Sequence, residues 1–235
     1  MRYISHFAKN ASTADTLIVI LPGAYQLPED FIAQGFVSAL QERDLPIDLF
    51  MAELSFDHIA DRTALTEIHQ DLILPAIKNG YKNIWLAGIS VGGYVAIAYA
   101  DRYANMLTNS RIQGLLLMAP YPGNRITTSA ITSAGGIKTW QAGSLTEDDI
   151  EFSNWGWLKR YADCAEIEVY LSYGADDRFA DGHAMMAQLL PESNVDKIAG
   201  DHTWPVWQQS WTDFLDRRFV KKLSTKQPLA NLSHA

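Results

Sequence analysis

A serine flanked by two glycines is the feature of this sequence most suggestive of chemistry. Gly88 and Gly92 lie two residues before and after Ser90, between an apolar run over residues 83–87 and a helical segment rich in small residues. Glycines at these positions permit a turn from strand to helix that is too tight for larger side chains. The serine would then stand at the amino end of a helix, where the N–H of Val91 can face a developing oxyanion. The pattern predicts a nucleophile at Ser90, although a glycine-rich turn without any chemistry has the same spacing.

A serine nucleophile needs a base that takes its proton and an acid that orients the base. The acidic candidates are Asp176 and Asp177, which follow a strand-like apolar run, and the basic candidate is His202, which follows a shorter one. Open α/β sheets bind ligands at the carboxyl ends of their strands, so these side chains are expected at the same edge as Ser90. The alternatives are local roles: one carboxylate as a turn or cap residue, and the histidine bonded to nearby backbone groups.

From about residue 16 to 219 the chain resembles the α/β-hydrolase family, in which nucleophile, acid and histidine follow one another in that order. The family commonly reads Gly-x-x-Asp after the strand that precedes the acid, and this chain has Gly174-Ala175-Asp176-Asp177 there. The resemblance therefore implies Asp177 as the acid, with Asp176 as its competitor. It also implies that His202, between a short strand and the final helix, is the base.

The resemblance further implies an oxyanion hole made of two backbone N–H groups. One belongs to Val91, and the other comes from the loop Leu21-Pro22-Gly23-Ala24-Tyr25, which follows the first buried strand. In the family the donor is usually the residue after the glycine, hence Ala24, with Tyr25 as the alternative. Pro22 has no N–H to donate. The family often has His-Gly where this chain has Pro-Gly, a departure that keeps the N–H but separates this chain from that subfamily pattern.

The other histidines give no second site. We expect His183, which follows the acid loop inside a predicted helix, at the surface. The rest precede the serine or lie in the C-terminal segment and lack the spacing of metal ligands; they are His6, His58, His69 and His234. No metal or organic cofactor is implied.

The elements that must position these residues alternate between strand and helix. Apolar runs predict buried strands, over residues 16–21, 46–54, 83–87, 112–119, 167–172 and 195–199. Helical spacing predicts helices over 29–42, 62–78, the segment after Ser90, 182–190 and 204–219, with a kink or shifted end at Pro75. The alternation predicts an α/β fold with a doubly wound, mostly parallel sheet, in one domain over residues 1–220 followed by a polar, frayed tail over 221–235.

One segment, residues 121–163, interrupts this alternation without a clear strand. An insertion of this length after the strand ending near residue 119 is expected to be a small cap that contacts substrate, or else a helical excursion that packs its tryptophans on the domain. The aromatic candidates for substrate binding are Tyr25 in the oxyanion loop and Tyr121, Trp140, Trp155 and Trp157 in the insertion.

The composition of the 235-residue chain is that of an ordinary globular protein. Hydrophobic residues make up 48% and charged residues 20%, and the formal net charge is −8. This negative charge argues against nucleic acid and anionic membranes as partners. Cys164 is the single cysteine, so no intrachain disulfide is expected. The first ten residues lack the apolar core of a signal peptide, and the apolar run over 17–21 is too short to span a bilayer, so the expected location is the cytoplasm.

The sequence thus predicts a serine hydrolase that cleaves a small-molecule carboxylic ester or thioester through an acyl-enzyme on Ser90. A thioesterase acting on a carrier protein or coenzyme A in a biosynthetic pathway is the nearest alternative. An amidase or peptidase is a further one. A ligand-binding protein without catalysis is the alternative of a different class, because a fold does not fix a function.

Overall fold

A single seven-stranded sheet forms the centre of the molecule. The structure is a computed structural model that describes residues 1–9, 14–55, 63–103, 112–146, 149–164 and 167–220. Its strand order is β1-β3-β2-β4-β5-β6-β7, and the strands are β1 (Tyr3–His6), β2 (Thr16–Leu21), β3 (Ile47–Ala52), β4 (Asn83–Ile89), β5 (Ile112–Met118), β6 (Glu168–Gly174) and β7 (Val195–Ile198). Only β1 runs antiparallel to its neighbour. The predicted doubly wound, mostly parallel sheet is confirmed.

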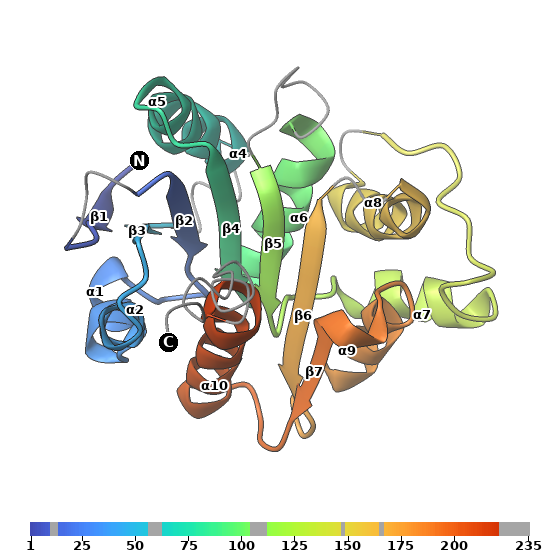
Figure 1. Ribbon diagram of the computed structural model, residues 1–235. Coiled ribbons are helices and arrows are strands. Elements are labelled where there is room, and N and C mark those ends of the chain that lie inside the picture. Colours follow the sequence, from blue (N-terminus) through green and yellow to red (C-terminus); the bar gives the residue numbers. More distant parts are fainter. Residues whose placement is uncertain (10–13, 56–62, 104–111, 147–148, 165–166, 221–235) are drawn as a thin grey trace, which may run out of the picture.

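Helices cover both faces of this sheet (Figure 1). On one face lie α4 (Ala64–Glu67), α6 (Val91–Tyr103) and α8 (Ile150–Cys164), and on the other lie α1 (Pro28–Ala33), α2 (Phe36–Glu42) and α10 (Trp204–Leu215). The central strands β2 and β4 are buried over nearly their whole length. Continuous apolar runs form such strands because helices exclude water from both sides.

Two predicted helices are interrupted, each for a backbone reason. The helix expected over 29–42 is divided into α1 and α2 by Gly35, whose φ of 81° is left-handed and ends a helical turn. The helix expected over 62–78 comprises α4, the π-helical turn η2 (Ile68–Ile73) and α5 (Leu74–Lys78). Pro75 has no N–H for the ladder, and the wider turn lies directly before it.

Strand β1 was not predicted from the sequence. It has four residues whose exposure alternates along the edge of the sheet, so it lacks the continuous apolar run of the inner strands. Its antiparallel pairing with β3 places Tyr3 opposite Ala52 and His6 opposite Leu49.

The carboxyl ends of the parallel strands lie along one edge of the sheet. The arrows of β2, β5 and β6 point to the lower edge in Figure 1, which is therefore the edge where a site is expected. The insertion contains α7 (Arg125–Ser133) and α8, so it is helical, and α9 (Ala180–Ala187), η3 (Glu192–Asn194) and η4 (Asp216–Val220) complete the fold. The predicted tail over 221–235 lies outside the described residues.

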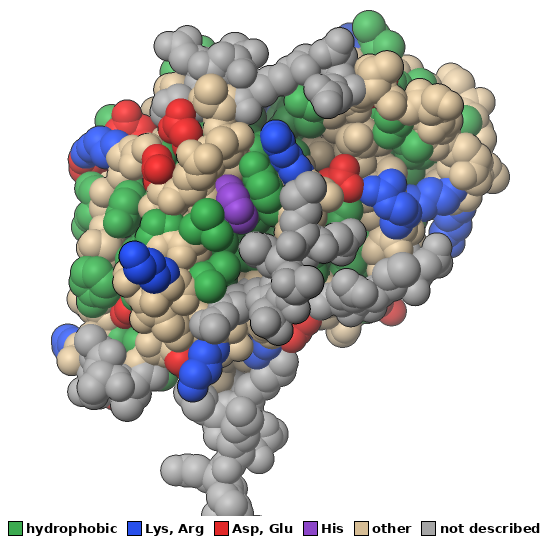
Figure 2. Space-filling model, turned by 90° about the horizontal axis from the view of Figure 1, so that it is seen from above, with side chains coloured by type: hydrophobic (Ala, Val, Ile, Leu, Met, Phe, Trp, Pro, Cys, Tyr) green, Lys and Arg blue, Asp and Glu red, His purple; other side chains and the backbone are tan. Residues whose placement is uncertain are grey.

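The end of the molecule where the parallel strands begin, opposite the edge at which a site is expected, is visible in Figure 2. Acidic, basic and apolar side chains are interspersed there. Within the part of the chain that the structure describes, no helix combines the length and apolarity needed to cross a bilayer.

Candidate active site

Ser90 occupies a strained turn between β4 and α6. Its φ is 51°, a left-handed conformation that is costly for a residue with a side chain. A Cβ atom at Gly88 would lie 2.4 Å from the backbone of Gly92, and one at Gly92 would lie 2.2 Å from the carbonyl oxygen of Leu21. Both glycines are therefore sterically required, as the sequence predicted. The strain is retained at a residue with a hydroxyl, which is typical of functional sites.

A second strained residue lies beside the serine. Ala119, directly after β5, has a φ of 48°, and this conformation turns the chain around the elbow formed by Ser90. The Ser90 N–H donates to the carbonyl of Met118 over 3.0 Å, and the Tyr121 N–H donates to the carbonyl of Ser90 over 2.8 Å. The segment after β5 thus holds the serine backbone from two sides.

His202 and Asp177 are hydrogen-bonded to each other. Nδ1 of His202 lies 2.7 Å from Oδ2 of Asp177, and the second carboxylate oxygen, Oδ1, accepts the Phe179 N–H over 2.8 Å. Asp177 is buried, whereas Asp176 is exposed. Of the two neighbouring carboxylates that the sequence left open, Asp177 is therefore the one that contacts the imidazole.

The loops that carry these two side chains are fixed to each other by their backbones. The N–H of Ala175 donates to the carbonyl oxygen of Ile198 over 2.6 Å, and the N–H of Asp176 donates to the carbonyl oxygen of Gly200 over 2.8 Å. A Cβ atom at Gly174 would lie 2.4 Å from the Gly200 carbonyl oxygen, so a glycine is needed for this close approach. The distance between Asp177 and His202 is thus set by neighbouring strand ends rather than by flexible side chains.

Asp177 is held as a carboxylate. Burial alone would raise its pKa, but the hydrogen bonds from His202 and from the Phe179 N–H outweigh it and lower the pKa below its ordinary value. A carboxylate that stays ionised at neutral pH can stabilise an imidazolium and select the tautomer that carries its proton on Nδ1.

The His202 ring lies between two aromatic rings. Phe179 and Trp207 meet it edge to face, with centroids 5.4 and 5.2 Å away. The Ser90 hydroxyl and Nε2 of His202, both in described residues, are not hydrogen-bonded to each other. In unliganded sites such bonds are often long and shorten when substrate binds.

The predicted oxyanion loop approaches the start of α6. The close contact of Gly92 with Leu21 and Pro22 brings this loop to the helix end that carries Val91. Gln26 closes the loop, because its side-chain oxygen accepts the Gly23 N–H over 2.6 Å. Within the described part of the chain, the N–H groups of Ala24 and Val91 donate no hydrogen bond. Both N–H groups are thus without an acceptor among the described residues, and their role as oxyanion donors stays a prediction.

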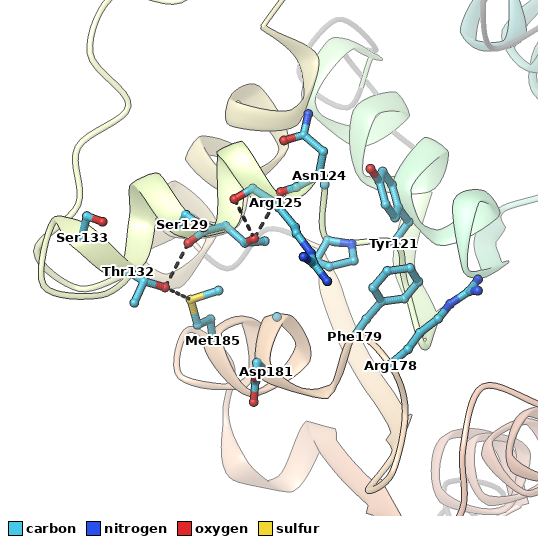
Figure 3. A pocket seen from close by; sticks show the side chains of 14 residues that line it. Tyr121, Asn124, Arg125, Ser129, Thr132, Ser133, Arg178, Phe179, Asp181 and Met185 are labelled. Atoms are coloured by element: carbon cyan, nitrogen blue, oxygen red, sulfur yellow. Dashed lines mark hydrogen bonds between the residues drawn. The ribbon is translucent and has the colours of Figure 1, made fainter.

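A groove of about 730 Å³ opens between α7 and the start of α9 (Figure 3), and neither Ser90 nor His202 is among its lining residues. Tyr121 and Phe179 form its aromatic wall, with ring centroids 5.6 Å apart. Because Tyr121 is bonded to Ser90 and Phe179 touches the His202 ring, this wall adjoins the candidate catalytic residues. Among the predicted aromatic candidates, Tyr121 lines the groove and Tyr25 does not; Tyr25 is 89% exposed on the oxyanion loop.

The three tryptophans of the insertion are buried and do not line this groove. Trp155 donates its indole N–H to the Pro122 carbonyl over 2.8 Å. Trp140 stacks on Phe152 and Trp157 on Tyr161. These contacts favour the packing interpretation of the insertion over the alternative of substrate binding by the tryptophans, which the structure does not test.

The expectation that His183 lies at the surface was wrong. Its side chain is fully buried, and its Nε2 lies 2.8 Å from the carbonyl oxygen of Pro120. Burial lowers the pKa of His183, so the ring is neutral and Nε2 carries the donated proton. A Cβ atom at Gly182 would lie 2.7 Å from the Pro122 side chain, which shows how closely α9 approaches this segment. The neighbouring glycine was the available signal for this burial.

Sequence reasoning also missed the groove residues Arg125, Arg178 and Phe179. Arg178 and Phe179 directly follow Asp177, so their position in the acid loop was a usable signal. Arg125 is the first residue of α7, and only the packing of that helix beside α9 brings it to the groove.

The sequence matches no protein-family model and no curated protein. Similarity is found to solved structures. A ferulic acid esterase is 15% identical, with 91% of this chain and 89% of that chain covered and a TM-score of 0.63. Est1E from Butyrivibrio proteoclasticus is 13% identical, with 94% of each chain covered and a TM-score of 0.58. MGS-MChE2, an alpha/beta hydrolase enzyme from the metagenome of lagoon sediments of Mar Chica, Morocco, is 16% identical, with 94% of each chain covered and a TM-score of 0.54. Together with the strand order and the helices on both faces of the sheet, these similarities show that the chain has the α/β-hydrolase fold.

Proposed function

We propose that this protein is a serine hydrolase that cleaves carboxylic esters, with Ser90 as nucleophile, His202 as base and Asp177 as the acid that orients it. The observation that carries the proposal is the 2.7 Å hydrogen bond between His202 and Asp177, at the sheet edge where Ser90 is held in a strained turn. A non-catalytic binding protein has no need for this combination of a strained serine and an oriented imidazole.

In the proposed reaction, Nε2 of His202 accepts the Ser90 hydroxyl proton while the oxygen attacks the ester carbonyl carbon. The tetrahedral intermediate collapses as His202 returns that proton to the departing alcohol, which leaves an acyl group on Ser90. Water then attacks the acyl carbonyl, and His202 takes its proton and gives it back to the Ser90 oxygen. The products are a carboxylic acid and an alcohol, and Asp177 stabilises the imidazolium in both halves of the cycle.

The oxyanion of both tetrahedral intermediates would be bound by the N–H groups of Val91 and Ala24, with Tyr25 as the alternative second donor. Preorganised backbone donors of this kind are strong because they need no reorganisation when charge develops. The Val91 donor also lies at the amino end of α6, a 13-residue helix whose dipole favours negative charge there.

The choice of esters rests on the structural neighbours, among which are a ferulic acid esterase and an alpha/beta hydrolase enzyme. Thioesters present a similar carbonyl, so they belong in the same substrate screen. The small-molecule class fits a groove of about 730 Å³, a volume in the range of ordinary ligand sites.

The test is reaction with a fluorophosphonate probe, together with hydrolysis of 4-nitrophenyl acetate and butyrate and a matched pair of thioesters. We expect the wild type to be labelled on Ser90 and to hydrolyse the esters, and Ser90→Ala to lose both properties while keeping its melting temperature. Ser38→Ala, on the exposed side of α2, is the matched control and should retain labelling and turnover. Near-wild-type activity of pure Ser90→Ala would refute the assignment, and labelling at another serine would do the same.

A further inference from the structure

Two arginines line the groove beside the candidate catalytic residues. Arg125 belongs to the first turn of α7, and Arg178 belongs to the acid loop before α9. Figure 3 shows the Arg125 side chain extending across the groove toward Phe179, while the Arg178 side chain runs outward beside the same ring. The Arg178 guanidinium carbon lies 4.8 Å from the Phe179 ring centroid. The two side chains come from different elements and line the same groove, on opposite sides of the Phe179 ring in Figure 3.

Neither arginine forms an ion pair with a described residue. Most other described arginines do, although the protein has an excess of acidic groups to offer all of them; the paired ones are Arg2, Arg43, Arg160, Arg217 and Arg218. Arg102, at the far end of α6, is also without an ion pair among the described residues, but it is remote from the groove and lies over the Tyr103 ring.

The carboxylates near the groove do not take these arginines as partners. Asp181 lines the groove without an ion pair to a described residue. Glu151 accepts from the Thr127 hydroxyl over 2.5 Å, the Asn124 N–H over 2.9 Å and the Tyr121 hydroxyl over 3.4 Å. Its charge is thus engaged at the amino end of α7, and both guanidinium groups remain available to a ligand.

We propose that this groove binds a carboxylate carried by the ester substrate, with Arg125 and Arg178 as its partners. The inference rests on the proposed function, because it places this charge on the part of the substrate that extends from Ser90 along the aromatic wall of Tyr121 and Phe179. Guanidinium groups match carboxylates because their planar fork can donate two parallel hydrogen bonds. The net charge of −8 repels anions from the molecule as a whole, so an unpaired cationic pair at this opening sets the specificity of the site.

The experiment compares pairs of esters that differ in one carboxylate. The acyl-side pair is 4-nitrophenyl hemiglutarate and 4-nitrophenyl valerate, and the alcohol-side pair is 4-carboxyphenyl butyrate and phenyl butyrate. For each enzyme we take the ratio of kcat/KM for the charged ester to that for the neutral one. Dividing the ratio of a variant by that of the wild type cancels the intrinsic reactivity of each ester.

We expect Arg125→Gln and Arg178→Gln each to lower this ratio about threefold to fivefold in one of the two pairs, the upper part of the range expected for an exposed ion pair. The double variant should lose more, and Arg102→Gln should leave the ratio within about twofold. An unchanged ratio in both pairs for the double variant would overturn the proposal.

Binding to Ser90→Ala, measured by calorimetry with the same esters, tests the groove independently of turnover. The charged member of the pair should bind more tightly than the neutral one, and the double arginine substitution should remove the difference. Equal binding of both members in both pairs would overturn the carboxylate subsite even if the esterase proposal holds. Conversely, a failure of the esterase proposal would appear as the absence of Ser90-dependent turnover of the neutral esters, while the binding preference persists.

Discussion

The backbone N–H of Tyr121 donates a 2.8 Å hydrogen bond to the carbonyl oxygen of Ser90. Tyr121 also lines the groove, so a groove residue is hydrogen-bonded to the backbone of the candidate nucleophile. Its ring in turn meets Phe179, which meets His202. Displacement of this segment would thus alter the groove and the serine together.

Substitution of Gly92 by alanine should destabilise the protein. A Cβ atom there would lie 2.2 Å from the Leu21 carbonyl oxygen, so the helix or the oxyanion loop must move. We expect a loss of about 1–3 kcal/mol in the free energy of unfolding, as for other overpacked sites, and a large loss of esterase activity. Gly156→Ala is the control, because the nearest atom to its Cβ lies 3.4 Å away on a flexible arginine. Equal stability of the two variants in urea unfolding would contradict the steric argument.

Asp177→Asn should reduce kcat roughly 10³- to 10⁴-fold, because an asparagine keeps the shape but neither stabilises an imidazolium nor selects the same tautomer. Asp176→Asn, one residue away and exposed, should stay within about threefold of the wild type. Steady-state kinetics with 4-nitrophenyl butyrate compares the two. The reverse order would assign the role to Asp176.

Buried His183 should make the protein less stable in acid. Burial lowers its folded-state pKa below the ordinary value of 6.5, so as the pH falls through 6.5 the unfolded chain gains a proton that the folded chain does not. Stability is therefore complete above this pH and decreases below it, by up to about 1.4 kcal/mol per pH unit until the folded-state pKa is reached.

The measurement is urea unfolding of the wild type and His183→Gln at pH 7.5 and 5.0. A glutamine can still donate to the Pro120 carbonyl but does not titrate, so the difference in stability between the two proteins should shrink in acid. An identical pH dependence of both proteins would show that His183 does not contribute to acid sensitivity.

Trp155 should matter for stability and not for the ranking of substrates. It is 1% exposed and its indole N–H is bonded to Pro122. Trp155→Phe removes that donor and leaves a buried carbonyl unpaired, for a loss of about 1–3 kcal/mol. Activity toward esters of increasing acyl length, measured beside melting curves, should keep the same order. A changed order in a variant of unaltered melting temperature would instead support a substrate contact.

Much of the fold follows from local patterns in the sequence. The apolar runs of β2 and β4 are buried on both faces, and such runs are recognisable without knowledge of their neighbours. The glycines around Ser90 were equally informative, because a backbone position with no space for a Cβ atom can be occupied only by glycine.

The tertiary structure decided the features that depend on segments distant in the chain. Asp176 and Asp177 are adjacent and chemically alike; the family resemblance favoured Asp177, and the packing of the loop that carries His202 is what brings that carboxylate to the imidazole. Likewise, His183 is buried because α9 packs against the segment after β5. The arginines of the groove are 53 positions apart, and no local pattern relates them. Periodicity in a sequence indicates which face of a helix or strand is apolar, whereas the partners of a polar side chain are set by long-range packing. For that reason the sequence by itself determined the helices and strands, and only the tertiary structure determined the contacts between them.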